Sequence, residues 1–228
     1  MRIYTSCIEA ITDIGREIKK CSTTTRCQTY QNQVVDGNPD FETRELQAFS
    51  FVILDTSDKD LMPNLHLEYC RAEVADRLLG EPINPGHSYL KRFDFWKEFL
   101  DGNDKFDYTY AERMHWQLGP VITELAEHPE TRQAIIEIHD RGIDQDRMGK
   151  KRIPCSMYYQ LMRRDGKLDM IYTMRSVDFV NHLANDIWMA AAIRDIIAEQ
   201  LSIPSGKFIL FAGSLHTYRK DWEALTNY

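Results

Sequence analysis

The chain contains 228 residues, and 43% of them are apolar, so it is long enough to bury a substantial hydrophobic core. Lys and Arg number 28 against 35 Asp and Glu, which gives a net charge of −7 and argues against a general nucleic-acid-binding protein. A charged fraction of 28% and an aromatic fraction of 11% exclude intrinsic disorder, collagen and coiled coil.

The sequence lacks targeting and metal-binding patterns. No segment approaches the roughly 20 consecutive apolar residues that cross a bilayer. The first residues, MRIYTSC, carry one charge and no apolar stretch, so a secretory signal is not expected. Five scattered cysteines without a CxxC pair predict neither a disulfide framework nor a zinc site. We therefore expect a cytoplasmic protein that binds no membrane, no nucleic acid and no metal.

The predicted elements follow an α+β pattern. Helices are predicted over 65–79, 89–100 and 116–127, followed by a strand over 132–138. The pair Asp165-Gly166 between two strand-like segments, 155–163 and 167–175, predicts a β-hairpin. A further helix contains Met189 to Leu201, Pro204 stops it, and a buried strand over 208–211 follows. Since no repeat or long linker interrupts this series, we expect one domain over residues 1–228.

Two groups of residues near the hairpin could carry chemistry. Cys155 follows a proline and a basic loop, residues 150–152, and is either a nucleophile or a buried structural thiol. Arg175 ends a buried-looking strand, where an unpaired charge is costly. It either pairs with Asp178 or, with the Ser176 hydroxyl, binds a phosphate group.

Two more groups lie further along the chain. Asp186 is near the start of the last predicted helix, where it either caps the helix or points along its apolar face into a pocket. His216 and Tyr218 alternate, so in a strand they share one face. They either hold a sugar hydroxyl or are satisfied structural groups.

Taken together and in this order, these groups resemble the thymidylate synthase family. The resemblance covers about residues 65–218 and includes Pro154-Cys155, Arg175-Ser176-x-Asp178, His216-x-Tyr218 and the approach segment Pro129-Glu130-Thr131-Arg132. It implies a thymidylate synthase-like fold, in which a mixed β-sheet packs with helices. It also implies a homodimer formed through the sheet, with a shared active site.

One departure from the family pattern indicates a branch. The eleventh residue after the family's arginine is an asparagine that pairs with uracil, and here it is Asp186. A protonated carboxyl can donate to N3 of cytosine and accept from its 4-amino group. Aspartate at this position resembles the phage-type deoxycytidylate hydroxymethylases and their cytidylate-specific relatives. The resemblance therefore implies dCMP or CMP as the substrate, with ribose or deoxyribose left open.

The resemblance also implies a mechanism. The Cys155 thiolate adds to C6 of the pyrimidine, and C5 attacks the one-carbon unit of 5,10-methylenetetrahydrofolate, the co-substrate. Water then adds to the exocyclic methylene, giving 5-hydroxymethylcytidylate. The general acid/base would be Glu68, with Glu73 as the fallback, and Tyr110 would lie near the cysteine. We expect the chain's end at Tyr228 to leave a wetter site that favours water over hydride.

The ligand contacts are likewise implied by the resemblance. Trp96 and Asp178 would contact the folate, while His216 and Tyr218 would hold the sugar. The phosphate would be bound by Arg175 and Ser176, with Arg132 supplied by the other subunit of the dimer. No clear match exists for the family's N-terminal phosphate arginine, for which Arg26 and Arg44 are candidates.

Three functions stay open at this level. The first is a cytidylate 5-hydroxymethylase, and the second is a thymidylate synthase or deoxyuridylate hydroxymethylase, which Asp186 distinguishes from the first. The third is a non-catalytic, nucleotide-binding dimeric module. The presence of Cys155, Arg175 and Asp178 argues against that module.

Overall fold

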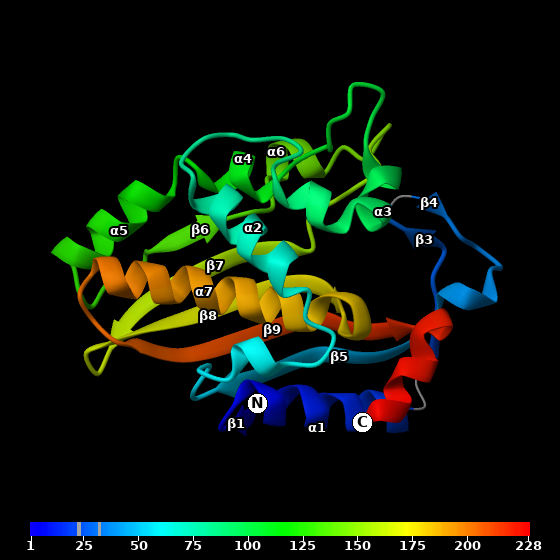
Figure 1. Cartoon of the computed structure of the whole chain (residues 1–228), viewed down its shortest axis with the longest axis horizontal. Helices are drawn as coiled ribbons and strands as arrows, with labels where there is room; N and C mark the ends of the chain where they lie inside the picture. The colour runs from blue at the N-terminus through cyan, green and yellow to red at the C-terminus, as the bar shows by residue number, and fades with distance from the viewer. Residues whose placement is uncertain (22–23, 32) are drawn as a thin grey trace.

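A mixed β-sheet forms the centre of the protein (Figure 1). The computed structural model describes residues 1–21, 24–31 and 33–228. The sheet has seven strands in the order β1-β5-β9-β8-β7-β6, with β2 paired to β5. The pairs β5–β9, β7–β8 and β6–β7 are antiparallel, whereas β1–β5 and β8–β9 are parallel. This architecture confirms the predicted α+β class with a mixed sheet.

The longest strands lie in the middle of the sheet. The strands are β1 (Arg2–Tyr4), β2 (Thr24–Arg26), β5 (Glu42–Ile53), β6 (Ile135–Glu137), β7 (Ser156–Arg164), β8 (Lys167–Asp178) and β9 (Ser205–Tyr218), and a separate pair is formed by β3 (Thr29–Tyr30) and β4 (Gln33–Val34). The helices are α1 (Cys7–Lys20), α2 (Leu67–Leu78), α3 (Phe93–Trp96), α4 (Tyr110–Met114), α5 (Leu118–Glu127), α6 (Arg141–Asp144) and α7 (Ala184–Gln200). Short 3₁₀ or π-helical turns cover Pro39–Phe41, Lys59–Leu61, Ser88–Arg92, Lys97–Phe99, Phe179–Leu183 and Arg219–Asn227.

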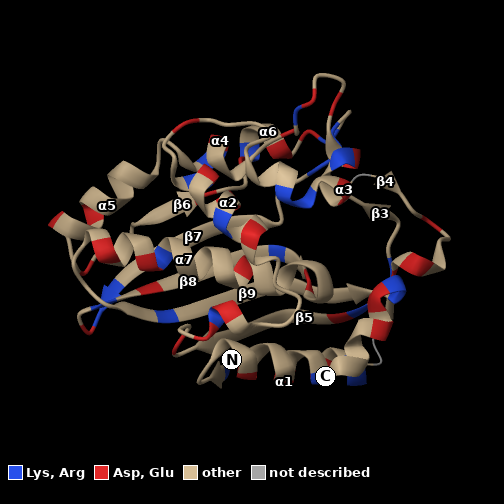
Figure 2. Ribbon diagram, viewed as in Figure 1, with Lys and Arg blue, Asp and Glu red and all other residues tan. Residues whose placement is uncertain are grey.

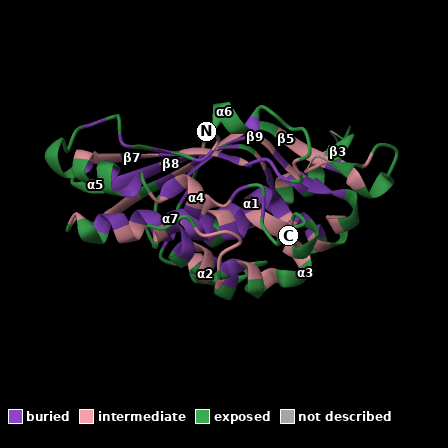
Figure 3. Cartoon of the chain, turned by 90° about the horizontal axis from the view of Figure 1, so that it is seen from above, coloured by how far each residue is buried: buried purple, intermediate pink, exposed green. Residues whose placement is uncertain are grey.

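The helices α1, α2 and α7 lie on the same side of the sheet (Figure 3). The right-handed twist of strands favours such a crossover helix between the parallel strands β8 and β9, and α7 takes that place. The opposite face keeps apolar side chains at its surface, and Phe211 is 40% exposed there.

The hairpin between β7 and β8 forms as its turn residues predict. Asp165 and Gly166 have φ of 51° and 73°, which is the left-handed pair that a two-residue turn of this kind requires. Along β8 the alternation of faces is also as predicted: Leu168, Met170, Tyr172 and Met174 are buried, and Ile171, Thr173 and Arg175 are more exposed. The buried row therefore faces the helices, as a period of two requires.

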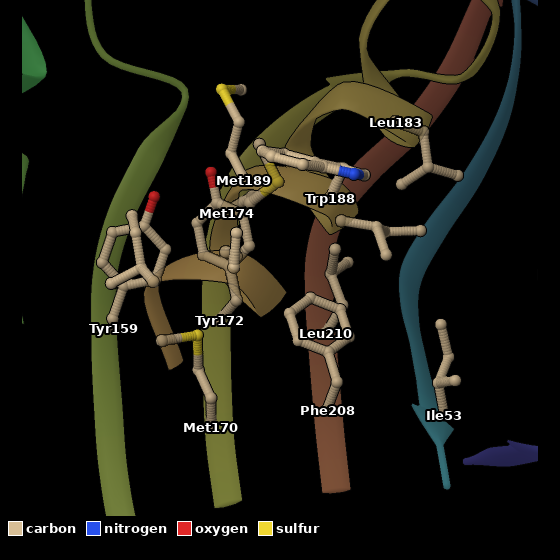
Figure 4. Packing of buried hydrophobic residues seen from close by; sticks show 14 of the residues in the cluster. Ile53, Tyr159, Met170, Tyr172, Met174, Leu183, Trp188, Met189, Phe208 and Leu210 are labelled. Atoms are coloured by element: carbon tan, nitrogen blue, oxygen red, sulfur yellow. The ribbon is translucent and has the colours of Figure 1, made fainter. Parts of the chain in front are cut away.

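The core lies between the sheet and α7 (Figure 4). It contains side chains from β7, β8 and β9 together with Leu183, Trp188 and Met189, which come from the last turn before α7 and from α7 itself. The phenol oxygens of Tyr159 and Tyr172 point toward the same end of the sheet. Cys155 lies beside the carboxyl end of β8, because its carbonyl accepts a hydrogen bond from the backbone N–H of Arg175.

Two predicted elements are corrected by the structure. Residues 89–100 do not form one helix but three short segments, Ser88–Arg92, α3 and Lys97–Phe99. The cause is the run of aromatic side chains in this region, because Trp96 packs on Tyr69 and Phe106 in different directions. The strand predicted over 132–138 is reduced to β6. No helix among the described residues is long and apolar enough to cross a membrane.

Candidate active site

A pocket lies where the strand ends meet α2 and α7. Five predicted residues line it from β8, from α7 and from the position just before β7: Cys155, Arg175, Ser176, Asp178 and Asp186. His216 and Tyr218 line it from β9, and Trp96 and Tyr110 from the opposite side. The structure therefore brings nine of the twelve predicted site residues together in one pocket.

The nucleophile candidate is held by its neighbouring strand. The backbone N–H of Arg175 donates to the carbonyl of Cys155 at 2.8 Å, and the Arg175 guanidinium donates to the carbonyls of Pro154 and Ile153 at 2.8 and 3.1 Å. The Cys155 Sγ atom lies 3.8 Å from both Ser176 Oγ and Gln31 Nε2. Two polar donors therefore face a sulfur atom whose backbone is fixed, which is suited to a thiolate.

Arg175 and Asp178 do not form the ion pair that was one of the sequence alternatives. The Arg175 Nη1 atom donates to Ser176 Oγ at 3.0 Å. Asp178 accepts from the backbone N–H groups of Val180 and Asn181 at 3.0 and 3.2 Å, and from Asn181 Nδ2 at 2.9 Å. Asp178 thus begins the turn that leads to α7. Among the described residues, no carboxylate pairs with the Arg175 guanidinium.

Asp186 faces the pocket and does not cap a helix. It lies in the first turn of α7, whose N-cap residue, Leu183, makes no side-chain hydrogen bond. Burial raises the pKa of the Asp186 carboxyl to about 7, and the positive charges of Arg77 and Arg92 counteract part of that rise. This carboxyl therefore exchanges its proton near neutral pH, and of the two sequence alternatives the structure shows the pocket-facing one.

His216 and Tyr218 share a face of β9, as predicted. Their ring centroids are 5.0 Å apart, and His216 Nδ1 is 3.2 Å from Ser214 Oγ. Tyr218 also meets the ring of Tyr30 edge-on at 5.5 Å. Burial lowers the pKa of His216, so its imidazole is neutral at physiological pH and can accept or donate a hydrogen bond.

The expected acid/base residue is corrected by the position of α2. Glu68 is 73% exposed, pairs with Arg71 on the helix surface and does not line the pocket. Glu73 does line it, together with Tyr69 and Arg77, because residues four apart share one face of a helix. Five residues of separation place Glu68 about 140° around the helix from Glu73. The fallback, Glu73, is therefore the glutamate that faces the pocket.

Glu73 belongs to a buried polar network. Arg77 Nε donates to Glu73 Oε1 at 3.0 Å, and Ser88 Oγ donates to Glu73 Oε2 at 2.6 Å. The Arg77 guanidinium lies 4.0 Å from the centroid of the Tyr110 ring and donates to the Tyr159 hydroxyl at 3.1 Å. Figure 2 shows charges of both signs along α2. Both carboxylate oxygens of Glu73 are therefore oriented by buried or half-buried donors.

The network reaches the residue that follows the nucleophile. Ser156 Oγ is hydrogen-bonded to the Tyr110 hydroxyl at 3.0 Å and to the Tyr172 hydroxyl. The Tyr159 and Tyr172 rings are stacked with centroids 4.5 Å apart. Burial raises the pKa of Tyr110 well above its usual range, so its hydroxyl stays protonated. Tyr110 therefore lies near the cysteine, where the resemblance expected it.

An aromatic wall closes the other side of the pocket. Trp96 contacts Phe95, Phe99 and Phe106 with ring centroids 4.7 to 6.2 Å apart. Asp178 also lines the pocket. Flat apolar surfaces with one carboxylate fit a flat heteroaromatic ring such as a pterin. No group of three or more His, Cys, Asp or Glu side chains in the described part of the chain is arranged to hold a metal.

Three arginine candidates do not reach the pocket of their own chain. Arg26 is exposed on β2, and Arg132 is exposed before β6. Arg44 stacks on the Trp222 ring at 4.3 Å and donates to the carbonyl of Lys19. The phosphate role of Arg26 and Arg44 is therefore not supported by their positions, whereas Arg132 was expected to act in the other subunit.

Some pocket residues were not singled out from the sequence. Arg77 could have been found, because a Glu73–Arg77 pair four residues apart is a recognisable helix pattern. Arg152 was noticed only as part of a basic loop, and its burial has no local signal. His182 lines the pocket with a pKa that burial lowers to about 4. Gln31 and His182 come to the site through tertiary packing alone.

Comparisons with known proteins agree with this geometry. A family model described as thymidylate synthase matches residues 82–228, more than half of the chain. The chain belongs to the thymidylate synthase family. The family consists of folate-dependent one-carbon transferases that act on nucleotide monophosphates, with methylenetetrahydrofolate as the source of the carbon. This confirms the predicted family.

Individual relatives are more distant. Two proteins named "Putative thymidylate synthase", from Methanosarcina barkeri and Methanosarcina acetivorans, are each 25% identical over 142 residues, which is 59% of this chain and 64% of theirs. The chain thus matches less than two thirds of the length of these relatives. The crystal structure of thymidylate synthase from T4 phage is similar with a TM-score of 0.73 and 20% identity, covering 95% of this chain and 78% of that one. This likeness confirms the expected thymidylate synthase fold.

Proposed function

We propose that the protein is a cytidylate 5-hydroxymethylase acting on dCMP or CMP. The observation that supports this most is the position of Asp186, which lines the same pocket as Cys155 and has a pKa of about 7. An acidic side chain that holds or shares a proton near neutral pH matches the hydrogen-bonding edge of cytosine. In the family pattern, an asparagine at this position pairs with uracil instead.

The covalent step begins at Cys155. Its sulfur adds to C6 of the pyrimidine, and the electron pair of the C5–C6 double bond makes C5 nucleophilic. Methylenetetrahydrofolate supplies the one-carbon unit that becomes bonded to C5. Ser176 and Gln31, each 3.8 Å from the sulfur, stabilise the thiolate that adds and later leaves.

Glu73 supports the proton transfers. A general base must remove the C5 proton while tetrahydrofolate leaves from the one-carbon unit, so that an exocyclic methylene forms on the nucleotide. Glu73 faces the pocket with both oxygens oriented by Arg77 and Ser88. Water then adds to the methylene carbon, the C6–sulfur bond breaks, and 5-hydroxymethylcytidylate is released.

The remaining contacts bind the ends of the nucleotide. Arg175 and Ser176 lie at the end of β8 and suit the phosphate, while His216 and Tyr218 on β9 suit the sugar hydroxyl. Arg132 is exposed on its own chain, so its phosphate role requires a homodimer in which it enters the pocket of the second copy. The apolar side chains on the open face of the sheet support such a dimer.

Thymidylate synthase is the second candidate. The names of the two Methanosarcina relatives favour it, because both carry the name of that enzyme. A thymidylate synthase would act on dUMP and would release a methylated product, so base preference and product identity separate the two functions. A non-catalytic module, the third alternative, would bind the nucleotide without exchanging its C5 hydrogen with solvent.

The test is a turnover comparison of CMP, dCMP and dUMP with methylenetetrahydrofolate, with products identified by mass spectrometry. We expect a hydroxymethylated cytosine nucleotide from the unmodified protein. In Asp186→Asn we expect the cytosine-to-uracil ratio of kcat/KM to fall by about 10⁴-fold, because the buried polar groups then mismatch cytosine. Asp165→Asn, in an exposed turn, is the matched control and should leave the ratio unchanged. An unchanged ratio in Asp186→Asn would refute the assignment.

A further inference from the structure

Arg152 is a buried cation on the wall of the pocket. It lies three residues before Cys155, is only 8% exposed, and lines the pocket together with the nucleophile. Charged side chains this deep are almost always paired, because moving a charge out of water is costly. The surroundings of this guanidinium therefore indicate what the pocket is built to bind.

Aromatic rings hold the guanidinium in place. Its Cζ atom lies 4.4 Å from the centroid of Trp96, 4.8 Å from that of Phe106 and 4.9 Å from that of Tyr108. Contacts of this type orient a planar cation and offset part of the cost of its burial. They supply no anion, and they leave the hydrogen-bonding edge of the guanidinium to other partners.

Within the described residues, Arg152 has no anionic partner. Its Nε atom is buried without a hydrogen bond, and its side chain takes part in no ion pair. Asp107 accepts from the backbone N–H of Arg152 at 2.8 Å, not from the side chain. Glu73 lies close enough to interact with the charge, but its oxygens are bound to Arg77 and Ser88.

The other lining charges do not compensate for Arg152. Arg77 is matched by Glu73, and Asp178 is engaged by backbone N–H groups and Asn181. Arg175 adds a second guanidinium that contacts carbonyls and a hydroxyl. In all, four arginines line the pocket (Arg77, Arg147, Arg152 and Arg175) against three carboxyl groups (Glu73, Asp178 and Asp186), and such a pocket attracts an anion.

We propose that Arg152 binds an oxyanion group of a ligand in this pocket, as a direct contact in addition to Arg175. The group is a phosphate or a carboxylate, which a guanidinium fork binds through two parallel hydrogen bonds. Two sources carry such a group: the phosphate of the nucleotide and the glutamate carboxylates of the folate. The inference rests on the proposed function only in taking a pyrimidine nucleotide and a folate as the pocket's ligands.

The experiment measures affinity with and without each oxyanion by titration calorimetry. The nucleotide arm compares dCMP with deoxycytidine and dUMP with deoxyuridine, so its result does not depend on which base the enzyme prefers. The folate arm compares folic acid with pteroic acid, which lacks the glutamate. In Arg152→Met we expect one of these affinity ratios to fall by about tenfold to hundredfold, and the arm that changes identifies the source.

Two further variants exclude a purely structural role. Arg113→Met is the matched control, because Arg113 is a mostly buried arginine beside the Tyr108 ring that is paired with Asp140 and Asp144 and does not line the pocket. It should leave both ratios unchanged. Arg152→Lys keeps the charge without the planar fork and should show a smaller decrease, which also serves if Arg152→Met does not fold. Ratios that stay within twofold of the unmodified protein in both Arg152 variants overturn the proposal.

Discussion

The two walls of the pocket are built in different ways. The first wall consists of the ends of β7, β8 and β9 with the start of α7, and backbone hydrogen bonds set its geometry. Asp178 pairs with His216 in the sheet register, and Ser176 pairs with Ser214. The second wall consists of α2 and the segments around residues 88–110 and 147–153. Side-chain contacts hold it together, such as Glu73 with Arg77 and Arg152 with Trp96.

This difference separates the roles of the walls. The pairing register of the sheet determines which face each strand side chain points to, because a slip of one residue would turn every side chain to the other face. The strand wall can therefore hold a nucleophile and its phosphate contacts in a constant arrangement. The helical wall depends on the rotation of α2 and on buried ion pairs, which makes its acid/base group the part most easily assigned to the wrong residue.

The largest expected effect tests the helical wall. Glu73→Gln should lower kcat by about 10²- to 10⁴-fold, because it removes a general base but preserves the shape of the side chain. Glu68→Gln should change kcat by less than twofold, since Glu68 is 73% exposed and pairs only with Arg71 among the described residues. The measurement is steady-state turnover of dCMP with methylenetetrahydrofolate.

The rate at which the C5 hydrogen of dCMP exchanges with solvent is a second measurement on this pair of variants. Glu73→Gln should slow the exchange while dCMP still binds, because Cys155 and the phosphate contacts are unchanged. A large loss in Glu68→Gln together with normal activity in Glu73→Gln would reverse the assignment of the two glutamates.

The same contrast explains how far the sequence could predict the site. Cys155, Arg175, Asp178, His216 and Tyr218 are found from short motifs, since each motif lies at the end of a strand whose alternation is visible in the sequence. Nothing local shows which face of α2 meets the pocket. The family resemblance therefore predicts Glu68, whereas the structure places Glu73 in the pocket.

Local sequence patterns also do not predict which charged side chains become buried through tertiary packing. Arg152 belongs to a basic segment that would be expected to lie in solvent, yet three aromatic rings enclose it. The helix predicted over residues 89–100 is broken for the same reason, because its aromatic side chains fill the pocket wall. Patterns in the sequence thus predicted the strand wall and missed most of the helical wall.

The second prediction concerns the free energy of unfolding and its dependence on the Asp186 carboxyl, which lies where the two walls meet. Burial raises the pKa of Asp186 from 3.8 to about 7, so between these values the folded protein keeps a proton that the unfolded chain has lost. The free energy of unfolding therefore falls as the pH rises through this window, and the full cost is reached above about pH 7. Asp186→Asn carries no such cost. Its gain in stability over the unmodified protein should be about 2 kcal/mol larger at pH 8 than at pH 5.

Urea unfolding without nucleotide at the two pH values measures this difference. Asp165→Asn serves as the control, because its carboxyl is in an exposed turn and should give the same small difference at both pH values. An equal stability gain at pH 5 and pH 8 in Asp186→Asn would mean that burial does not raise the pKa of the Asp186 carboxyl.

The last prediction concerns the pH dependence of nucleotide affinity. Cytosine in solution has no proton on N3 at neutral pH, so its pairing with Asp186 requires one proton between the carboxyl and N3. Below about pH 7 the carboxyl already holds that proton, and the affinity for dCMP should be constant. Above this value the proton must be taken up on binding, so the affinity should fall about tenfold per pH unit. Calorimetry from pH 6 to pH 9 measures the fall, and Asp186→Asn should show none because its amide does not titrate. An affinity for dCMP that does not change with pH in the unmodified protein would show that the base is recognised without this proton. The pocket would then select the base by its shape alone.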